Sequence, residues 1–265
     1  MAESSNGATR VALVTGAARG IGRGIALRLA DDGLDVAVND IEANGDEFDS
    51  VAGEIRGKGR RTAAITADVS EPNEVQSMVR RVADELGHLD VMVANAGIAQ
   101  VIPLLELTLE DWDRMMSINL RGVFLCYQAA AKQMIDQGGG GKIIGAASIV
   151  AYRPFPLLGH YSASKWAVRG LTQAAAQEWA QYGITVNAYC PGIVGTAMWD
   201  EIDEKLAENE GLQKGEAIEK YSDLIALGRV SVPEDVASFV SYLASKDSDY
   251  MTGQSVMIDG GIQFS

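Results

Sequence analysis

Short apolar runs alternate with longer amphipathic stretches along most of the chain. Between the runs, apolar residues recur at helical spacing, as in residues 20–32, 72–87, 108–136 and 161–182. The runs contain little polar alternation, which is typical of strands buried on both faces. Their alternation with helices predicts an α/β fold, in which helices cover both faces of a parallel sheet. The predicted strands are residues 11–15, 35–39, 61–67, 90–95, 142–148, 184–190 and 254–260.

Two segments depart from this rhythm. The four glycines at 138–141 follow a helical pattern and precede a strand, the reverse of the order in a phosphate loop, so we expect a turn. Residues 197–228 form a polar and apolar insert that is either a solvated helical excursion or a substrate lid. Since no linker divides the chain, we expect one domain over residues 1–265, with the insert inside it.

A glycine-rich loop joins the first predicted strand to the first predicted helix. Gly16, Gly20 and Gly22 have the spacing T-G-x-x-x-G-x-G. Glycines here permit a tight turn and let backbone N–H groups and the helix N-terminus approach a pyrophosphate. At the end of the second strand, Asp40 can accept hydrogen bonds from ribose hydroxyls and repel a 2′-phosphate. Arg19 argues for NADP(H), but no Lys or Arg lies between residues 41 and 50, so we expect NAD(H).

Composition narrows the possible partners. The 265 residues carry a formal net charge of −14, which disfavours nucleic acid and anionic membranes as ligands. Two distant cysteines and two histidines give no disulfide framework, metal site or Ser–His–Asp arrangement, so we expect no metal. The first ten residues are polar, and no apolar stretch reaches the roughly 18 residues that span a bilayer. A cytoplasmic protein is the expectation.

Tyr161 and Lys165 lie four residues apart, within the sequence YSASK. In a helix this spacing puts both on one face. A phenol beside an ammonium is either an ordinary surface pair or an acid whose pKa is tuned.

These motifs together resemble those of the short-chain dehydrogenase/reductase family over residues 10–261. The shared features are TGAARGIG (15–22), DV (68–69), NAG (95–97), the single residues Asn119 and Ser148, YSASK (161–165) and PG (191–192). The thirteen residues from Ser148 to Tyr161 and the four from Tyr161 to Lys165 make the combination specific. The resemblance implies a Rossmann-like, doubly wound seven-stranded sheet in the order 3-2-1-4-5-6-7.

The resemblance also implies roles for individual residues. The catalytic set is Asn119, Ser148, Tyr161 and Lys165. The cofactor-binding set is Gly16, Arg19, Gly20, Ile21, Gly22, Asp40, Ile41, Asp68, Val69, Asn95, Ala96, Gly97, Tyr161, Lys165, Pro191, Gly192, Ile193 and Thr196. Free tyrosine has a pKa near ~10, and we expect the Lys165 ammonium to lower that of Tyr161 so that the phenol can exchange protons with substrate.

Within the family, residues 157–203 and 225–261 are similar to acetoin/diacetyl reductases and 2,3-butanediol dehydrogenases. The implied substrates are small hydroxyketones, diketones and diols. Alternatives are a ketose reductase or polyol dehydrogenase, an NADPH-dependent 3-ketoacyl reductase, and a protein that senses NAD without turnover. The family analogy predicts a homotetramer. Residues flanking the motifs are candidates for the substrate pocket, namely Ile98, Gln100, Ile149, Phe155, Leu158, His160, Met198 and Trp199.

Overall fold

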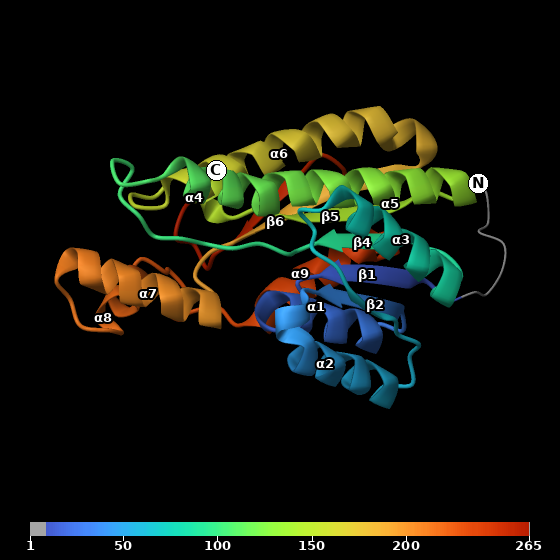
Figure 1. Cartoon of the computed structure of the whole chain (residues 1–265), viewed down its shortest axis with the longest axis horizontal. Helices are drawn as coiled ribbons and strands as arrows, with labels where there is room; N and C mark the ends of the chain where they lie inside the picture. The colour runs from blue at the N-terminus through green and yellow to red at the C-terminus, as the bar shows by residue number, and fades with distance from the viewer. Residues whose placement is uncertain (1–8, 265) are drawn as a thin grey trace.

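The computed structural model describes residues 9–264, so most of the polar first ten residues lie outside it. Seven parallel strands form one sheet in the order β3-β2-β1-β4-β5-β6-β7, which confirms the predicted topology (Figure 1). The strands are β1 (Val11–Thr15), β2 (Asp35–Asp40), β3 (Ala64–Thr66), β4 (Val91–Ala94), β5 (Gly141–Ala146), β6 (Ile184–Pro191) and β7 (Ser255–Ile258). The order reverses between β1 and β4, and ligands of such sheets bind at the carboxyl ends beside this switch point.

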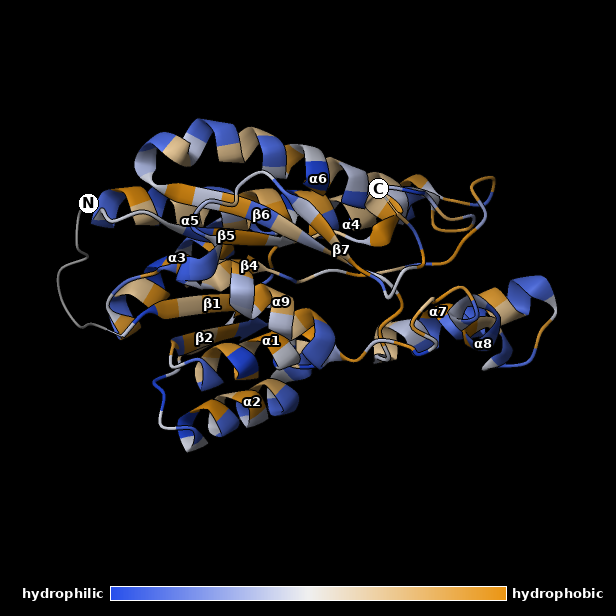
Figure 2. Cartoon of the chain, turned by 180° about the vertical axis from the view of Figure 1, so that it is seen from behind, coloured by the Kyte–Doolittle hydropathy of each residue, from blue (hydrophilic) through white to orange (hydrophobic). Residues whose placement is uncertain are grey.

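Helices cover both faces of the sheet, as Figures 1 and 2 show from opposite sides. On one face, α1 (Gly20–Asp31), α2 (Gly45–Gly57) and α9 (Pro233–Ala244) pack on the strands and bury one apolar cluster. On the other face, α3 (Pro72–Leu86), α5 (Val123–Gln137) and α6 (Gly159–Trp179) bury a second cluster. Both clusters draw on β1, β4, β5 and β6, which explains why these strands are mostly apolar.

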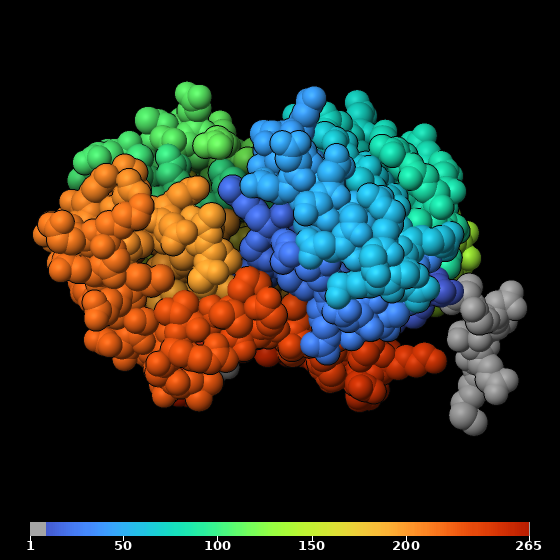
Figure 3. Space-filling model, turned by 90° about the horizontal axis from the view of Figure 1, so that it is seen from below, coloured from blue at the N-terminus to red at the C-terminus, as the bar shows by residue number. Residues whose placement is uncertain are grey.

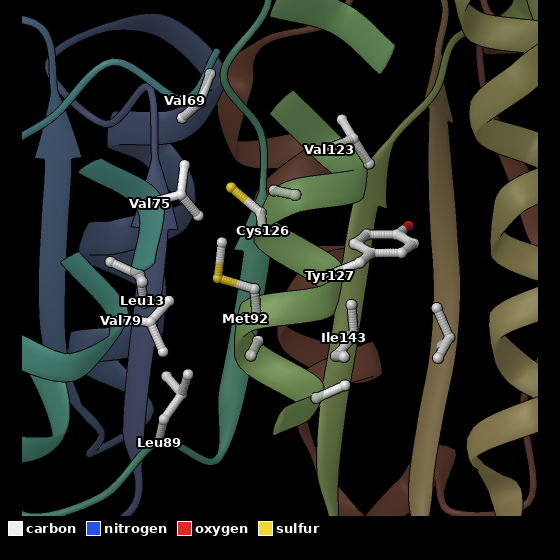
Figure 4. Close-up of a cluster of buried hydrophobic side chains, with 14 of the residues drawn as sticks. Leu13, Val69, Val75, Val79, Leu89, Met92, Val123, Cys126, Tyr127 and Ile143 are labelled. Carbon is white, nitrogen blue, oxygen red and sulfur yellow. The ribbon is translucent and has the colours of Figure 1, made fainter. Parts of the chain in front are cut away.

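Figure 4 shows part of the second cluster, where Met92 of β4 and Ile143 of β5 face Cys126 and Tyr127 of α5. Each of these side chains is at most 1% exposed. Complete burial of a large apolar side chain contributes about 1.5–3 kcal/mol. Within residues 9–264, no helix has both the length and the apolarity needed to cross a bilayer.

Several predicted boundaries change in the structure. The predicted strand 61–67 is shorter in the structure, where β3 spans Ala64–Thr66, although the N–H groups of Val36 and Val38 still donate to the carbonyls of Arg61 and Ala63. Arg60 and Arg61, before β3, form ion pairs with the buried Asp35. The predicted helix 161–182 begins earlier, at Gly159, and tightens into a 3₁₀ turn over Ala180–Tyr182. The glycines at 138–141 form the predicted turn, since the first three of them have positive φ and the fourth begins β5.

The predicted helix 108–136 is interrupted. It consists of α4 (Leu109–Met116), a π-helical segment over Ser117–Gly122, and α5. Such segments are rare and often lie at functional sites. Here the π segment carries Asn119, and the close packing of Gly122 on Val69 leaves no space for a side chain at residue 122.

The insert at 197–228 contains α7 (Ala197–Glu210) and α8 (Glu216–Ser222), which lie together at one end of the molecule (Figure 1). Asp203 of α7 is 4% exposed, and its carboxylate accepts hydrogen bonds from the N–H groups of Gly215 and Ile218 at 2.6 and 2.7 Å. The two helices are therefore joined as one hairpin.

Candidate active site

The glycine loop lies between β1 and α1. Gly16 has φ +63°, and a Cβ on it would lie 2.8 Å from Ala96 Cα. A Cβ on Gly22 would lie 2.1 Å from the Gly16 carbonyl oxygen, because α1 starts directly against the turn. Both positions therefore require glycine, and the backbone of the loop is held close to the end of β4.

The N-terminus of α1 suits an anion. No side chain caps it, and its first turn contains no acidic residue. The first N–H groups of a helix lack partners within the helix and carry a partial positive charge. Arg19, immediately before the helix, is exposed and adds a positive charge. Ile21 lies in the first turn, and the Thr196 side chain lies beside Gly20, since a Cβ there would be 3.4 Å from Thr196 Cγ2.

Asp40 ends β2 and is 9% exposed. Its Oδ2 accepts from the N–H of Ala18 at 3.0 Å. Its Oδ1 accepts from the N–H of Ile41 at 2.9 Å and from Asn44 Nδ2 at 2.7 Å. These bonds fix a charged carboxylate beside the glycine loop, where a ribose would follow a pyrophosphate bound at α1.

Asp68 and Val69 follow β3 at the same edge of the sheet. The Asp68 carboxylate accepts from the N–H of Ser70 at 2.8 Å, and Val69 is buried against Gly122. The segment is thus fixed, and its placement fits the side of an adenine pocket.

The end of β4 is tied to the glycine loop. Asn95 Nδ2 donates to the carbonyl oxygens of Thr15 and Gly16 at 2.8 and 3.1 Å. The hydroxyl of Thr15 accepts from the N–H groups of Asn95 and Ala96 at 3.0 and 3.1 Å. The Asn95 side chain therefore shapes the cleft by holding its walls together.

Asn119 and Lys165 meet beside Gly97. A Cβ on Gly97 would lie 3.2 Å from Asn119 Oδ1 and 3.5 Å from Lys165 Nζ. Asn119 is fully buried, and its amide bonds both the N–H and the carbonyl of Ile98 at 2.9 Å. It thus anchors the segment after β4, while Lys165 donates to the Ala146 carbonyl at the end of β5 at 2.9 Å.

Tyr161 lies with Lys165 and Ser148 at the carboxyl edge. Lys165 Nζ is 5.5 Å from the centre of the Tyr161 ring. Ser148 is 6% exposed, and its hydroxyl accepts from the N–H of Val150 at 3.3 Å. The structure therefore brings together three of the predicted catalytic side chains. The fourth, Asn119, lies next to Lys165, since both side chains lie against Gly97.

The predicted tuning of the phenol by Lys165 is wrong for the protein alone. Burial raises the pKa of Tyr161 to about 12, although interaction with the Ser148 hydroxyl lowers it. Burial also lowers the pKa of Lys165 to about 8. Desolvation disfavours the charged form of each group, so both are shifted toward their neutral forms.

The segment after β6 lies opposite the glycine loop. Pro191 ends the strand, and the N–H of Gly192 donates to the Ile258 carbonyl at 3.0 Å. A Cβ on Gly192 would lie 2.8 Å from Asp259 Cβ, so the backbone can pass here only as glycine. Ile193 is buried, and the chain then reaches Thr196 beside the loop. Figure 3 shows the surface hollowed between the blue amino-terminal residues and the orange insert.

The insert packs on Tyr161 through an apolar cluster. Phe155, Met198 and Trp199, which the sequence predicted for the pocket, lie in this cluster together with Leu158. Sequence reasoning missed Tyr221 of α8, whose ring meets Phe155 edge-on at 5.1 Å between centroids. A tyrosine within a polar insert is the only signal that could have indicated it. The other cluster members that it missed are Ala99, Val101, Leu157, Ile202, Leu206, Ala207, Leu212 and Ala217.

Three predicted pocket residues, Gln100, Ile149 and His160, make hydrogen bonds outside the apolar cluster. His160 Nε2 lies 3.0 Å from Gln100 Oε1, and Gln100 Nε2 donates to Asp111 of α4 at 2.7 Å. His160 is fully buried, and burial lowers its pKa. The Ile149 carbonyl accepts from Gln263 at 2.7 Å. These residues hold the pocket walls in place, and Ile98 does so through its backbone bonds to Asn119.

Comparisons with known proteins agree with this geometry. A family model described as "Enoyl-(Acyl carrier protein) reductase" matches residues 16–263. The chain is 50% identical to a short-chain dehydrogenase/reductase of Armillaria gallica, over 100% of both chains. It is 49% identical to an L-2,3-butanediol dehydrogenase of Corynebacterium glutamicum, over 97% of this chain and 100% of that protein.

It is also 46% identical to a diacetyl reductase [(S)-acetoin forming] of Staphylococcus epidermidis, over 97% of this chain and 99% of that protein. Among solved structures, a short-chain type dehydrogenase/reductase of Mycobacterium marinum superposes with a TM-score of 0.86 at 39% identity, covering 97% of this chain and 96% of the other. With these matches over nearly its whole length, the chain belongs to the short-chain dehydrogenase/reductase family of oxidoreductases.

Proposed function

We propose that the chain is an NAD(H)-dependent oxidoreductase that interconverts small ketones and hydroxyketones, such as diacetyl and acetoin, with secondary alcohols or diols. The observation that carries the proposal is the placement of Tyr161. Its phenol lies beside Lys165, at the sheet edge that also carries the glycine loop, and under the apolar insert. The names of the butanediol and diacetyl relatives support this substrate class.

The chemistry requires a hydride at carbon and a proton at oxygen. Bound nicotinamide would supply the hydride. Tyr161 supplies the proton, because a phenol with a pKa of about 12 is fully protonated at neutral pH. Ser148 shares the substrate oxygen, and Lys165, with a pKa of about 8, is mostly charged at pH 7 and favours the phenolate as it forms. In the protein alone, the phenol is therefore in the protonated form that ketone reduction requires.

The cleft fits a dinucleotide. The uncapped N-terminus of α1 suits its pyrophosphate, and Asp40 suits an unphosphorylated ribose. Asp68 and Val69 would hold the adenine. Asn95, Ala96 and Gly97 would line the cleft, Lys165 would bind the second ribose, and Pro191, Gly192, Ile193 and Thr196 would hold the nicotinamide.

The apolar cluster around Tyr161 suits a small, weakly polar ketone. We further propose that residues 197–228 close over it as a lid, within a single catalytic domain of residues 1–265. The hairpin of α7 and α8 would move as a unit, because the buried Asp203 joins its two helices. Ketoses and polyols are the main alternative substrates, and they would require additional polar groups in this pocket.

A 3-ketoacyl reductase should prefer NADPH and present a basic surface to an acidic carrier, yet the formal net charge is −14. The description of the matching family model also suggests an enoyl thioester as an alternative substrate. A protein that only senses NAD would not need Tyr161. We therefore keep these three as outcomes of the test below.

The test is NADH and NADPH oxidation with acetoin, diacetyl, a ketose, a bulky aryl ketone, a 3-ketoacyl thioester and an enoyl thioester. We expect NADH with diacetyl and acetoin to give the highest kcat/KM. Tyr161→Phe should lower this turnover by about 10²–10⁴ and retain NADH binding. Preference for a thioester with NADPH, or binding of NADH without any turnover, would instead select one of the alternatives.

We also propose a cytoplasmic homotetramer. Both cysteines are buried free thiols, as expected in a reducing compartment. A surface groove along α4, α5 and α6 is lined by Leu109, Phe124 and Leu171, with Glu110 and Arg121 among its charges. Because both signs of charge flank apolar side chains, the groove can pair with its own two-fold copy. The edge strand β7 offers a second contact surface.

A further inference from the structure

A buried tyrosine of β6 reaches the glycine loop through Asn95. Tyr189 is fully buried, and its hydroxyl donates to Asn95 Oδ1 at 2.7 Å. The same amide donates from Nδ2 to the carbonyl oxygens of Thr15 and Gly16 at 2.8 and 3.1 Å. Every polar atom of the Asn95 side chain thus has a partner.

These bonds determine which way the amide faces. Carbonyl oxygens accept only, so the amide nitrogen must face Thr15 and Gly16. The amide oxygen then points away from the loop and needs a donor of its own, and Tyr189 provides it. A flipped amide would set its oxygen against two carbonyl oxygens, and the phenol would face an N–H₂ group.

Tyr189 is also long enough to reach Asn95 from β6. Strand β5 lies between β6 and β4, and neighbouring strands are about 4.7–4.9 Å apart. A donor on β6 must therefore cross β5 to serve the end of β4. Tyrosine does so, whereas the small apolar residues that otherwise fill such strands have neither the length nor a hydroxyl.

The amide is also part of the loop's packing. A Cβ on Gly22 would lie 2.5 Å from Asn95 Nδ2, so the first turn of α1 rests directly on this group. A shift of the amide would move the turn that presents the N–H groups proposed to hold a pyrophosphate.

We propose that Tyr189 is a positioning residue of the dinucleotide site, whose hydroxyl locks the Asn95 amide and thereby the glycine loop. This inference rests on the proposed function, since it concerns affinity for the proposed cofactor. Tyr189 touches neither the loop nor the reacting groups through its hydroxyl, so it acts on NADH binding and leaves proton transfer unchanged. Burial raises the pKa of Tyr189 well above its usual value, so the hydroxyl remains a donor throughout the assay range.

Tyr127 provides a matched control. It is also fully buried, and its hydroxyl lies 3.0 Å from the Thr172 hydroxyl. It belongs to the cluster on the other face of the sheet, shown in Figure 4, and has no bond to the glycine loop. Tyr127→Phe therefore removes a comparable buried hydroxyl without touching Asn95.

The experiment measures the Kd of NADH by titration calorimetry for the wild type, Tyr189→Phe and Tyr127→Phe, with kcat, ketone KM and Tm for each. The Kd of NADH should rise about tenfold in Tyr189→Phe, because Asn95 Oδ1 loses its hydrogen bond from the Tyr189 hydroxyl. We expect kcat at saturating NADH to change less than about twofold, and Tyr127→Phe to lower Tm without changing the Kd. The ratio of Kd values should be the same at pH 6 and pH 9.

A double-mutant cycle with Asn95→Ala tests whether Tyr189 acts through the Asn95 amide. If Tyr189 acts through the amide, Tyr189→Phe will add no further loss of NADH affinity in the Asn95→Ala background. An unchanged Kd in Tyr189→Phe, an equal rise in Tyr127→Phe, or full additivity in the cycle would overturn the inference. A wild-type protein that binds neither NADH nor NADPH would instead overturn the proposed function.

Discussion

Asp40 offers a sharp test of the cofactor assignment. Its carboxylate is held by the N–H groups of Ala18 and Ile41 and by Asn44, at distances of 2.7–3.0 Å. It is 9% exposed, so its charge is only weakly screened by solvent. Ile41 is 46% exposed, so an arginine substituted there can reach a phosphate at the mouth of the cleft.

Two effects set the size of the expected change in cofactor preference. A hydrogen bond from a ribose hydroxyl to a charged group contributes about 1.5–3 kcal/mol. The repulsion between a carboxylate and a 2′-phosphate about 4 Å away is about 4 kcal/mol per unit charge near a protein surface. Asp40→Ser combined with Ile41→Arg should remove both, together about 5.5–7 kcal/mol, and we expect the ratio of kcat/KM for NADH over NADPH to fall by about 10⁴–10⁵.

The assay compares kcat/KM for the two cofactors at fixed acetoin, with Tm as a check on folding. Glu42→Ser is the control, because it removes the same charge from an exposed position two residues away. Its ratio should change by less than about twofold. A wild type that prefers NADPH, or a Glu42→Ser ratio that shifts as much as that of the double variant, would refute the reasoning.

Other predictions concern protonation, the insert and assembly. Burial lowers the pKa of Lys165 from 10.5 to about 8, so the unfolded chain binds more protons than the folded chain between pH 8 and pH 10.5. Across this range, the unfolding free energy of the wild type should rise by about 3 kcal/mol relative to that of Lys165→Met. Below pH 7, the difference between the two proteins should not change with pH. Asp203→Ala should loosen the α7–α8 hairpin and raise the ketone KM about tenfold at an unchanged Kd for NADH, measured by steady-state kinetics and titration. Leu109→Glu with Phe124→Glu should yield smaller species in sizing chromatography, and an unchanged elution volume would exclude that interface.

Much of the fold could be predicted from local pattern. The strand 11–15 was predicted at its true bounds, because a fully buried parallel strand has an uninterrupted apolar run. The break at Ser117–Gly122 could not be predicted, since apolar spacing continues through it. Its cause is tertiary, namely the pairing of Asn119 with the backbone of Ile98 and the contact of Gly122 with Val69.

The candidate site divides in a similar way. Spacing and order identified Ser148, Tyr161 and Lys165, and the structure brings them together. The direction of the pKa shift was mispredicted, because a one-dimensional pattern shows neighbouring charges and does not show desolvation. Tyr189 and Tyr221 were missed because their partners are distant in sequence: Tyr189 bonds to Asn95, 94 residues away, and Tyr221 packs on Phe155.

The central claim is that Tyr161 delivers the proton to the ketone oxygen. The most direct test is single-turnover reduction of diacetyl by Tyr161→Phe, with Tyr152→Phe as the control. Tyr152 lies close to Ser148 in sequence, but its hydroxyl donates to the Ser255 carbonyl. We predict that Tyr161→Phe loses about 10²–10⁴ in rate while its Kd for NADH stays within about twofold, and that Tyr152→Phe keeps most of its rate. A Tyr161→Phe protein that reduces diacetyl at more than about a tenth of the wild-type rate contradicts the account.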